Sequence, residues 1–209
     1  MQRPNTKTAA MNIDSLKLIL CAGDLDDFVD KSVLGVESPH FSAEKTNHVA
    51  KELASKFSVD INAINIHVVG SAKLGFGLFE KRTKSGETLP PFRPFGPESD
   101  IDLAIVSPPL YEAIWNELSI YANQCPWMPW DSGRLGDYMI YGWLRPDHFP
   151  KFARLRRCDD WWDLFRALSS NSRLGRRSIR GALYYSEEHL RRYQVRSLNQ
   201  CRNKLETRE

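Results

Sequence analysis

The sequence predicts an α/β or α+β domain in which a small mixed sheet is flanked by helices. Segments with apolar residues every three or four positions alternate with segments rich in Ile and Val at every second position. This alternation follows no strict order, so a purely parallel sheet is not implied. Apolar residues make up 42% of the 209 residues, enough to fill the core of one domain.

Helices are expected along the whole chain. An apolar helical pattern covers residues 13–29, and the spacing of Val49, Leu53 and Phe57 gives a buried face to a helix that begins after Ser42. Further helices are expected over Pro109–Asn123, Trp161–Leu168 and Glu187–Leu205. The last of these is amphipathic and rich in Arg, which makes the C-terminal helix basic.

Four strands are expected, at Ile61–Val69, Asp100–Val106, Tyr138–Leu144 and Arg177–Tyr185. The segment 81–97 contains four Pro and two Gly, so it should be a surface loop without a regular element. We therefore expect a flexible tail at residues 1–12 and a single domain at 13–209. That domain would carry a Pro-rich insertion at 81–97 and the basic helix at 187–205.

The distribution of charge is asymmetric. Residues 134–209 contain 17 Lys and Arg against 9 Asp and Glu, whereas the first 133 residues contain 12 against 17. A basic surface beside acidic chemistry suits polyphosphate or nucleic acid, although Arg-rich helices are equally often just solvated faces.

No run of about 18 apolar residues occurs, and the first residues lack the apolar stretch of a signal peptide. We expect a soluble, cytoplasmic protein with no membrane insertion. The four Cys lie far apart, without the spacing of a zinc site, so we expect reduced and mostly buried thiols.

The first candidate site is the turn at Gly70-Ser71, directly after an apolar strand. A chain that turns at Gly after a strand can direct its N–H groups and the Ser71 hydroxyl at phosphate oxygens. The spacing of a Walker motif is absent. Taken alone, an ordinary tight turn is the commoner explanation of such a pair.

The second candidate site is the segment Ser99-Asp100-Ile101-Asp102-Leu103. Because side chains alternate along a strand, Asp100 and Asp102 should lie on one face, while Ile101 faces the core. Two carboxylates this close repel each other unless a cation compensates them, and hard oxygen ligands favour Mg²⁺ or Mn²⁺. A solvated strand end is the alternative.

Together, the strand ending at Gly70-Ser71 and the strand with Asp100 and Asp102 resemble the nucleotidyltransferases of the DNA polymerase beta-like superfamily. The resemblance implies the nucleotidyltransferase fold over residues 13–209, phosphates of an NTP or dNTP held at the Gly-Ser turn, and Mg²⁺ or Mn²⁺ bound by the two Asp. It also implies transfer of a nucleoside monophosphate to a hydroxyl group with release of pyrophosphate.

Two features depart from the family pattern. The insertion lengthens the gap between Ser71 and Asp100. Basic residues in this gap either contact phosphates or simply belong to a surface insertion. These candidates are Lys73, Lys81, Arg82, Lys84 and Arg93, of which Lys73 is the expected nucleotide-binding residue. The family usually has a third carboxylate on a later strand, and only weak candidates exist here: Asp137, Asp147 and Glu187.

In size the chain is similar to compact stand-alone bacterial nucleotidyltransferases, one group of which belongs to the two-protein Hailong anti-phage system and makes single-stranded DNA oligomers. On that resemblance the expected product is an oligonucleotide that binds along the basic C-terminal region. This expectation involves Arg180, Arg191, Arg192, Arg196 and Arg202, and a priming hydroxyl at Tyr184, Tyr185 or Tyr193 if these are not packed in the core.

Two alternatives remain. The protein transfers a nucleotide to a partner protein of a toxin–antitoxin pair, or it is a degenerate module that binds nucleotide without chemistry. In the first case a cognate toxin or effector protein is the expected partner. The aromatic stretches Trp127–Trp130 and Trp161-Trp162 are either base-stacking platforms or, more often for such residues, core packing.

Overall fold

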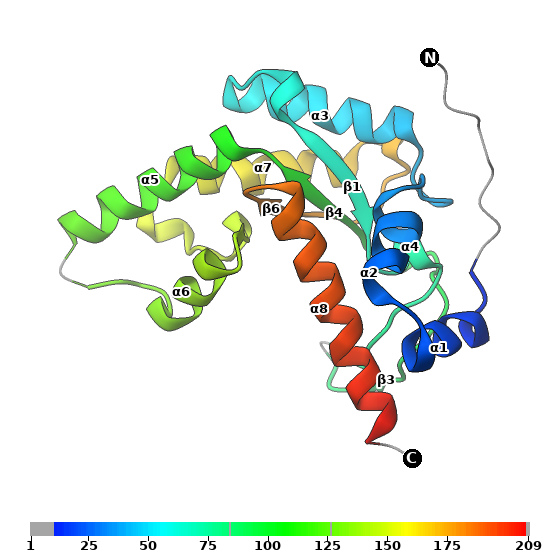
Figure 1. The fold of residues 1–209 in the computed structure, drawn as a ribbon. Coiled ribbons are helices and arrows are strands. Elements are labelled where there is room, and N and C mark those ends of the chain that lie inside the picture. Colours follow the sequence, from blue (N-terminus) through cyan, green and yellow to red (C-terminus); the bar gives the residue numbers. More distant parts are fainter. Residues whose placement is uncertain (1–10, 84, 126, 208–209) are drawn as a thin grey trace.

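The protein forms a four-stranded mixed sheet with helices on both faces (Figure 1). The computed structural model describes residues 11–83, 85–125 and 127–207. The strand order is β1-β4-β6-β5, where β4 is antiparallel to β1 and parallel to β6, and β5 is antiparallel to β6. The strands are β1 (Asn65–Val69), β4 (Ile101–Val106), β5 (Trp143–Leu144) and β6 (Ile179–Tyr184). This arrangement confirms the predicted mixture of helices with a small mixed sheet.

The helices account for most of the chain. The α-helices are α1 (Ile13–Ala22), α2 (Leu25–Phe28), α3 (Ala43–Phe57), α4 (Ser71–Leu74), α5 (Pro108–Gln124), α6 (Ser132–Ile140), α7 (Arg156–Ser170) and α8 (Glu187–Glu206). A π-helix, η1 (Val29–Leu34), and four short 3₁₀ helices complete them: η2 (Ile61–Ala63), η3 (Pro146–His148), η4 (Lys151–Ala153) and η5 (Ser172–Leu174). None of the helices in the described part of the chain is both long and apolar enough to cross a membrane.

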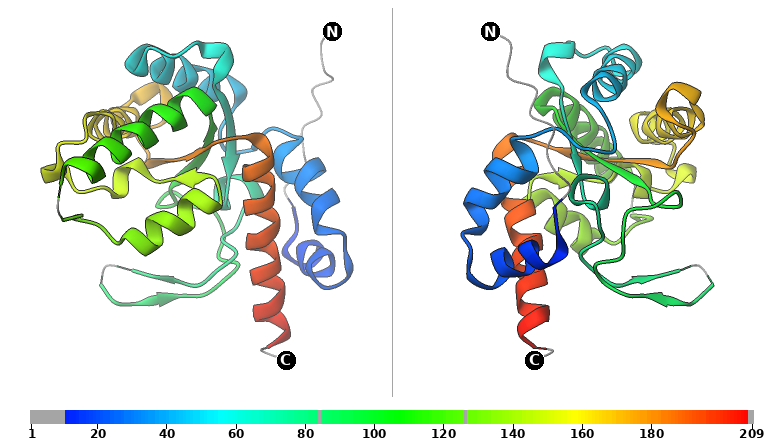
Figure 2. Two further views of the ribbon diagram at one scale, coloured as in Figure 1. Left: turned by 60° about the vertical axis from the view of Figure 1, so that its left-hand side comes forward. Right: turned by 90° about the vertical axis from the view of Figure 1, so that its right-hand side faces the viewer.

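Alternation along β4 divides the core into two layers. Ile101, Leu103 and Ile105 pack with buried residues of α3, α5 and α7, including the fully buried Trp161. The opposite face of β4 carries Asp102, Ala104 and Val106, and the last two pack with Tyr184 and with Leu190 of α8. Figure 2 shows α8 crossing this second face, which we call the α8 face. The candidate carboxylates therefore lie on the face that only part of α8 covers.

Several sequence predictions need correction at their ends. The first strand begins at Asn65 instead of Ile61, because residues 61–63 form a 3₁₀ turn capped by the Asp60 side chain, which accepts the Asn62 N–H at 2.9 Å. The proposed tail at 1–12 falls largely outside the described residues. Asn12 itself caps α1 by accepting the Asp14 N–H at 2.8 Å.

The strand predicted at Tyr138–Leu144 is mostly wrong. Its first residues belong to α6, and the Tyr141 N–H donates to the Asp137 C=O at 3.0 Å, continuing the helical pattern. Gly142 then turns the chain at a φ of 64°, so only Trp143 and Leu144 pair with β6. An apolar run this short does not distinguish helix from strand by its pattern.

The prediction that 81–97 has no regular element is also wrong. Lys81–Arg82 and Thr88–Leu89 form a two-stranded hairpin, β2 and β3, which projects from the body of the molecule in Figure 2. Gly86 provides its turn with a φ of 88°. All four Pro lie after β3, so they do not interrupt the hairpin.

Gly181 in β6 allows α7 to approach the sheet closely. A Cβ at this position would lie 2.3 Å from Cζ of Phe165 and 2.8 Å from Cζ2 of Trp161. We expect Gly181→Ala to lower the free energy of unfolding by about 1–3 kcal/mol, since the rings must shift in a packed core. Urea denaturation measures this change.

Gly136→Ala is the matched control. A Cβ at Gly136 meets no atom within 4 Å, and this residue lies inside α6. Ala should therefore stabilise the protein there by about 0.5–1 kcal/mol. Equal effects of the two substitutions would contradict the close packing of α7 on β6.

Candidate functional site

The candidate site begins where β1 ends. Gly70 has φ 63° and ψ −146°, a conformation that essentially only Gly adopts. A Cβ on Gly70 would also lie 3.1 Å from Oδ2 of Asp102, so Gly is required for space as well as for conformation. Ser71 follows as the first residue of α4, where backbone N–H groups have no partner within the helix. The predicted Gly-Ser turn is thus placed directly against one predicted carboxylate.

Strand pairing brings the two halves of the motif together. Asp102 pairs with Val69 of β1 on one side and with Arg180 of β6 on the other. Asp100 lies just before β4, and its Oδ2 is 3.3 Å from a terminal nitrogen of Arg180 and 3.7 Å from Nζ of Lys81. Gly70, Ser71, Asp100 and Asp102 therefore lie at one end of the sheet.

The electrostatics of Asp102 depend on its surroundings. Burial, followed by the neighbouring charge of Asp100, raises its pKa. The positive charges of Arg180, Arg145 and Lys81 oppose this rise in that order. For Asp102 these cations thus do not outweigh burial and the charge of Asp100.

These two carboxylates fit a Mg²⁺ or Mn²⁺ ion that also binds a substrate. Mg²⁺ commonly takes one or two protein carboxylates and completes its shell with water and phosphate oxygens. The donor set itself favours a hard cation here, since Asp102 lies near the start of β4, two residues after Asp100 and beside the end of β1. No group of three or more His, Cys, Asp or Glu side chains with metal-ligand geometry occurs among the described residues, so the protein alone would not enclose the ion.

Lys73 lies apart from the carboxylates. Its side chain is only 7% exposed, and its Nζ donates to the C=O of Val36, in the segment before α3. Burial lowers its pKa to about 8, partly offset by the charge of Glu37. Of the basic residues of the insertion, Lys81 reaches Asp100, whereas Arg93 donates to the C=O of Phe79 at 2.9 Å. Lys84 lies outside the described residues.

Two of the three candidates for a third carboxylate lie far from Asp102 or in solvent. Glu187 pairs with His67 of β1 at 3.0 Å, and its side chain is about half exposed; His67 lies two strand positions, or roughly 7 Å, from the level of Asp102. Asp137 is exposed on α6. Arg180 occupies the position opposite Asp102 on the neighbouring strand, so a cation stands there instead of an acid.

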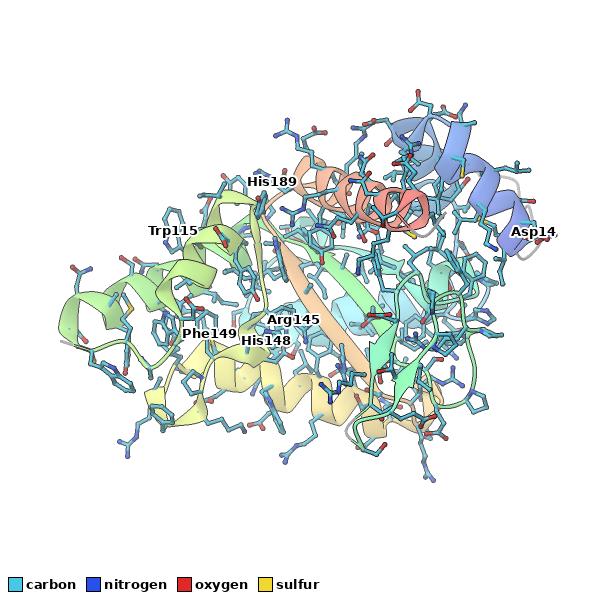
Figure 3. The ribbon with its side chains drawn as sticks, turned by 90° about the horizontal axis from the view of Figure 1, so that it is seen from below. Asp14, Trp115, Arg145, His148, Phe149 and His189 are labelled. Atoms are coloured by element: carbon cyan, nitrogen blue, oxygen red, sulfur yellow. The ribbon has the colours of Figure 1, made fainter. Side chains whose placement is uncertain are left out.

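The third candidate, Asp147, belongs to an ion pair beside the site. Nε and a terminal nitrogen of Arg145 donate to its two carboxylate oxygens at 2.8 and 2.7 Å. Figure 3 shows Arg145 beside the sheet, where its charge acts on both Asp147 and Asp102. The sequence pattern assigned Asp147 a weak candidacy as the third carboxylate and gave Arg145 no role. An Arg and an Asp two positions apart after a strand are the signal that could have indicated their pairing.

Aromatic side chains gather on the same face. Tyr138, Trp143, Tyr184 and Tyr193 form a chain of ring contacts with centroids 4.3–6.5 Å apart. Tyr184 is only 2% exposed and lies beside Val106, at the other end of β4 from Asp102. The Tyr184 hydroxyl is thus packed in the core, which was the expected alternative to a priming role for this residue.

The Trp residues of the two aromatic stretches divide between core and surface. Trp161 is fully buried and Trp130 packs on Tyr121 and Phe149, whereas Trp127 is 67% exposed and Trp162 39% exposed. Core packing therefore accounts for one Trp in each stretch.

Most arginines of α8 bind the protein itself. Arg191 pairs with Asp26 and Asp30 at 2.9 and 2.7 Å, Arg192 pairs with Glu188 at 2.7 Å, and Arg202 donates to backbone carbonyls at the end of α1. Arg196 stacks on Tyr141 at 3.6 Å from the ring centroid. Part of the basic character of this helix therefore stabilises its docking on α1, α2 and η1.

The chain shows no significant match to any protein-family model, curated protein or solved structure.

Removing the Asp102 charge should stabilise the metal-free protein. Because its pKa is raised on folding, the folded state binds the Asp102 proton more tightly, so stability falls as pH rises through the interval between the unfolded and folded pKa. Above the folded pKa of Asp102 this cost is fully present. We expect Asp102→Asn to raise Tm in chelator, and Mg²⁺ or Mn²⁺ to raise the Tm of the wild type but not of the variant.

Glu112→Gln on the exposed side of α5 is the control and should leave Tm within about 1–2 °C. A lower Tm for Asp102→Asn in chelator would show that the carboxylate is stabilised by its neighbours without a cation.

Asp147 should show the opposite pH dependence. Burial would raise its pKa, but the hydrogen bonds and charge of Arg145 lower it overall. The pair therefore stabilises the fold above the unfolded pKa of Asp147, and this contribution is lost as pH falls through the lowered folded value. We expect Asp147→Asn to cost about 2 kcal/mol at neutral pH, because it leaves Arg145 without its carboxylate.

Urea unfolding of both proteins at neutral pH and at about pH 3 measures this difference, which should shrink at the lower pH. The same cost at both pH values would indicate that shape, not charge, holds Asp147 in place.

Proposed function

We propose that the protein is a metal-dependent nucleotidyltransferase with the fold of the DNA polymerase beta-like superfamily. The observation that carries this proposal is the placement of Gly70 beside Asp102, where a Cβ on Gly70 would lie 3.1 Å from Oδ2 of Asp102, because it brings the Gly-Ser turn to the start of β4. Neither half is specific alone. Their juxtaposition provides phosphate-binding N–H groups beside carboxylates that favour a cation.

In this proposal each residue has a defined task. Ser71 and the N–H groups that follow Gly70 bind the phosphates of an NTP or dNTP. Asp100 and Asp102 hold Mg²⁺ or Mn²⁺ with phosphate oxygens, and the metal when bound offsets charge on the triphosphate and on the acceptor oxygen. Arg180 and Lys81, which contact Asp100, lie where they can turn to phosphate oxygens once a cation replaces them.

The transfer itself is an in-line displacement. A bond forms between the acceptor oxygen and the α-phosphorus, the bond to the pyrophosphate oxygen breaks, and the acceptor proton is released to solvent. Asp100 and Asp102 fix the geometry of the reacting groups, since Asp102 lies in β4 and Asp100 directly precedes this strand at the end of the sheet.

We propose that the acceptor is a growing oligonucleotide, in keeping with an anti-phage system that makes single-stranded DNA. Arg180 and Arg196 are the basic residues best placed to follow such a product, since both lie on the α8 face. The chain would act in the cytoplasm with a cognate effector protein. Transfer to a hydroxyl of a toxin-like partner is the alternative acceptor.

A second candidate function, nucleotide binding without transfer, rests on one specific observation. Arg180 stands opposite Asp102, on the strand where the resemblance expects a third carboxylate, and pairs with Asp100 at 3.3 Å. A cation supplied by the protein in this place would favour binding of phosphate over assembly of two metal ions.

The proposal is tested by incubating the protein with each labelled NTP and dNTP and Mg²⁺ or Mn²⁺, alone and with a candidate partner. We expect a ladder of products from the wild type. The double variant Asp100→Asn, Asp102→Asn should be slower by at least about 100-fold, since losing a metal site costs several kcal/mol of transition-state stabilisation. Gel electrophoresis and mass spectrometry distinguish the ladder from a single added nucleotide on a protein.

Glu112→Gln serves again as the control and should retain full activity. Nucleotide binding without any product, under every condition, would favour the second candidate function.

A further inference from the structure

A pocket of about 180 Å³ lies between β6 and α7. Its walls include three aromatic side chains of α7, namely Trp161, Trp162 and Phe165, and its floor is the first half of β6. It is smaller than the roughly 300–1,000 Å³ of sites that enclose a whole drug-sized ligand, so it suits one ring system.

The floor of this pocket is an open sheet edge. The Ile101 N–H donates to the Ser178 C=O, and the Ser107 N–H donates to the Tyr184 C=O. The even-numbered residues of β6 therefore direct their backbone N–H and C=O groups toward β4. Odd-numbered residues therefore direct their N–H and C=O groups to the other edge. On that edge Leu183 pairs with Leu144 of β5.

Pro146 leaves Gly181 without a partner in the ladder. Continuing the pairing of Leu144 with Leu183 places Pro146 opposite Gly181. Pro has no N–H, and the chain turns into η3 at this point. Within the part of the chain that the structure describes, no strand thus pairs with the backbone N–H and C=O of Gly181, which border the pocket.

Ser169 limits what can bind along this edge. Its Oγ accepts the Ile179 N–H at 2.9 Å and lies 3.3 Å from the Ile179 C=O. An added peptide strand needs successive backbone pairs, and only Gly181 remains. One donor and one acceptor from a single residue instead match the Watson–Crick edge of a nucleobase, which carries both kinds of group side by side.

We propose that this pocket binds the base of a nucleotide, stacked on Trp162 of α7 and held at its edge by Gly181. This inference rests on the proposed function, because it assigns the base of the substrate whose phosphates lie at Asp100 and Asp102. The two sites share a residue. Arg180 lines the pocket and pairs with Asp100, and β6 separates the pocket from β4.

The distance between the sites is suitable for one nucleotide. Strands are about 4.8 Å apart, so a base bound at the open edge of β6 lies two strand spacings, roughly 10 Å, from β4, and both sites are at the same end of the sheet. Arg166 also lines the pocket, and Lys151 lies 4.3 Å from the ring centroid of Trp162, which adds positive charge near a nucleotide.

The test uses nucleosides, which lack phosphates, in a buffer with chelator, so that the carboxylates contribute nothing. Calorimetry should detect binding of at least one of adenosine, guanosine, cytidine, uridine and thymidine to the wild type. Trp162→Ala should weaken that binding by at least about fivefold, since stacking on an aromatic side chain is lost. Trp115→Ala, at a more exposed Trp on α5, is the matched control and should have no effect.

A second measurement does not depend on a variant that must fold. In ¹⁵N-labelled protein the Gly181 amide signal should shift on addition of the nucleoside, while that of Gly136 in α6 should not. Binding that leaves the Gly181 signal and the Trp162→Ala affinity unchanged would overturn the proposal, as would the absence of binding by all five nucleosides.

Failure of this inference can be distinguished from failure of the proposed function. If the wild type makes no product but nucleosides still shift Gly181, the base pocket stands and the chemistry fails. If the protein is active while Trp162→Ala changes neither nucleoside affinity nor KM, the pocket is not the base site. The Asp100→Asn, Asp102→Asn variant should keep its nucleoside affinity in either case.

Discussion

The pairing of β4 between an antiparallel β1 and a parallel β6 is the constraint on which the rest of the structure depends. It places Asp102 between Val69 and Arg180, and so sets the end of β1 against the start of β4. A slip of one residue in either pairing would exchange the buried Ile101 and Leu103 with Asp102, and charge would enter the core. Burial of the apolar face therefore fixes the position of the carboxylates on the α8 face.

The same constraint produces the electrostatic character of the site. Asp102 lies two residues after Asp100, and burial, followed by the charge of Asp100, raises the pKa of Asp102. Cations from three other segments approach them: Lys81 from the hairpin, Arg145 after β5 and Arg180 from β6. The acidic and basic side chains of such a site suit a ligand that brings both a divalent cation and phosphates.

Helix α7 and Pro146 shape the other side of this sheet end. Because Gly181 has no side chain, Phe165 and Trp161 pack directly on β6, and because Pro146 cannot continue the ladder, the edge of β6 stays open beside them. Arg180, with its backbone in this edge strand and its side chain on Asp100, connects the pocket with the carboxylates. One strand thus contributes to both proposed halves of a nucleotide site.

Local periodicity and the conformations open to Gly predict, from the sequence alone, the mixture of helices and sheet, the strand that ends before Gly70 and the strand that carries Asp102 after Asp100. The sequence pattern does not resolve Tyr138–Leu144, where a short apolar run fits helix and strand alike, and it does not reveal the hairpin at Lys81–Leu89. The contact of Lys73 with Val36, the placement of the Arg145–Asp147 pair near Asp102 and the position of Arg180 opposite Asp102 follow from the tertiary structure alone. These contacts join residues through strand register and chain reversals, which no periodicity along the sequence encodes.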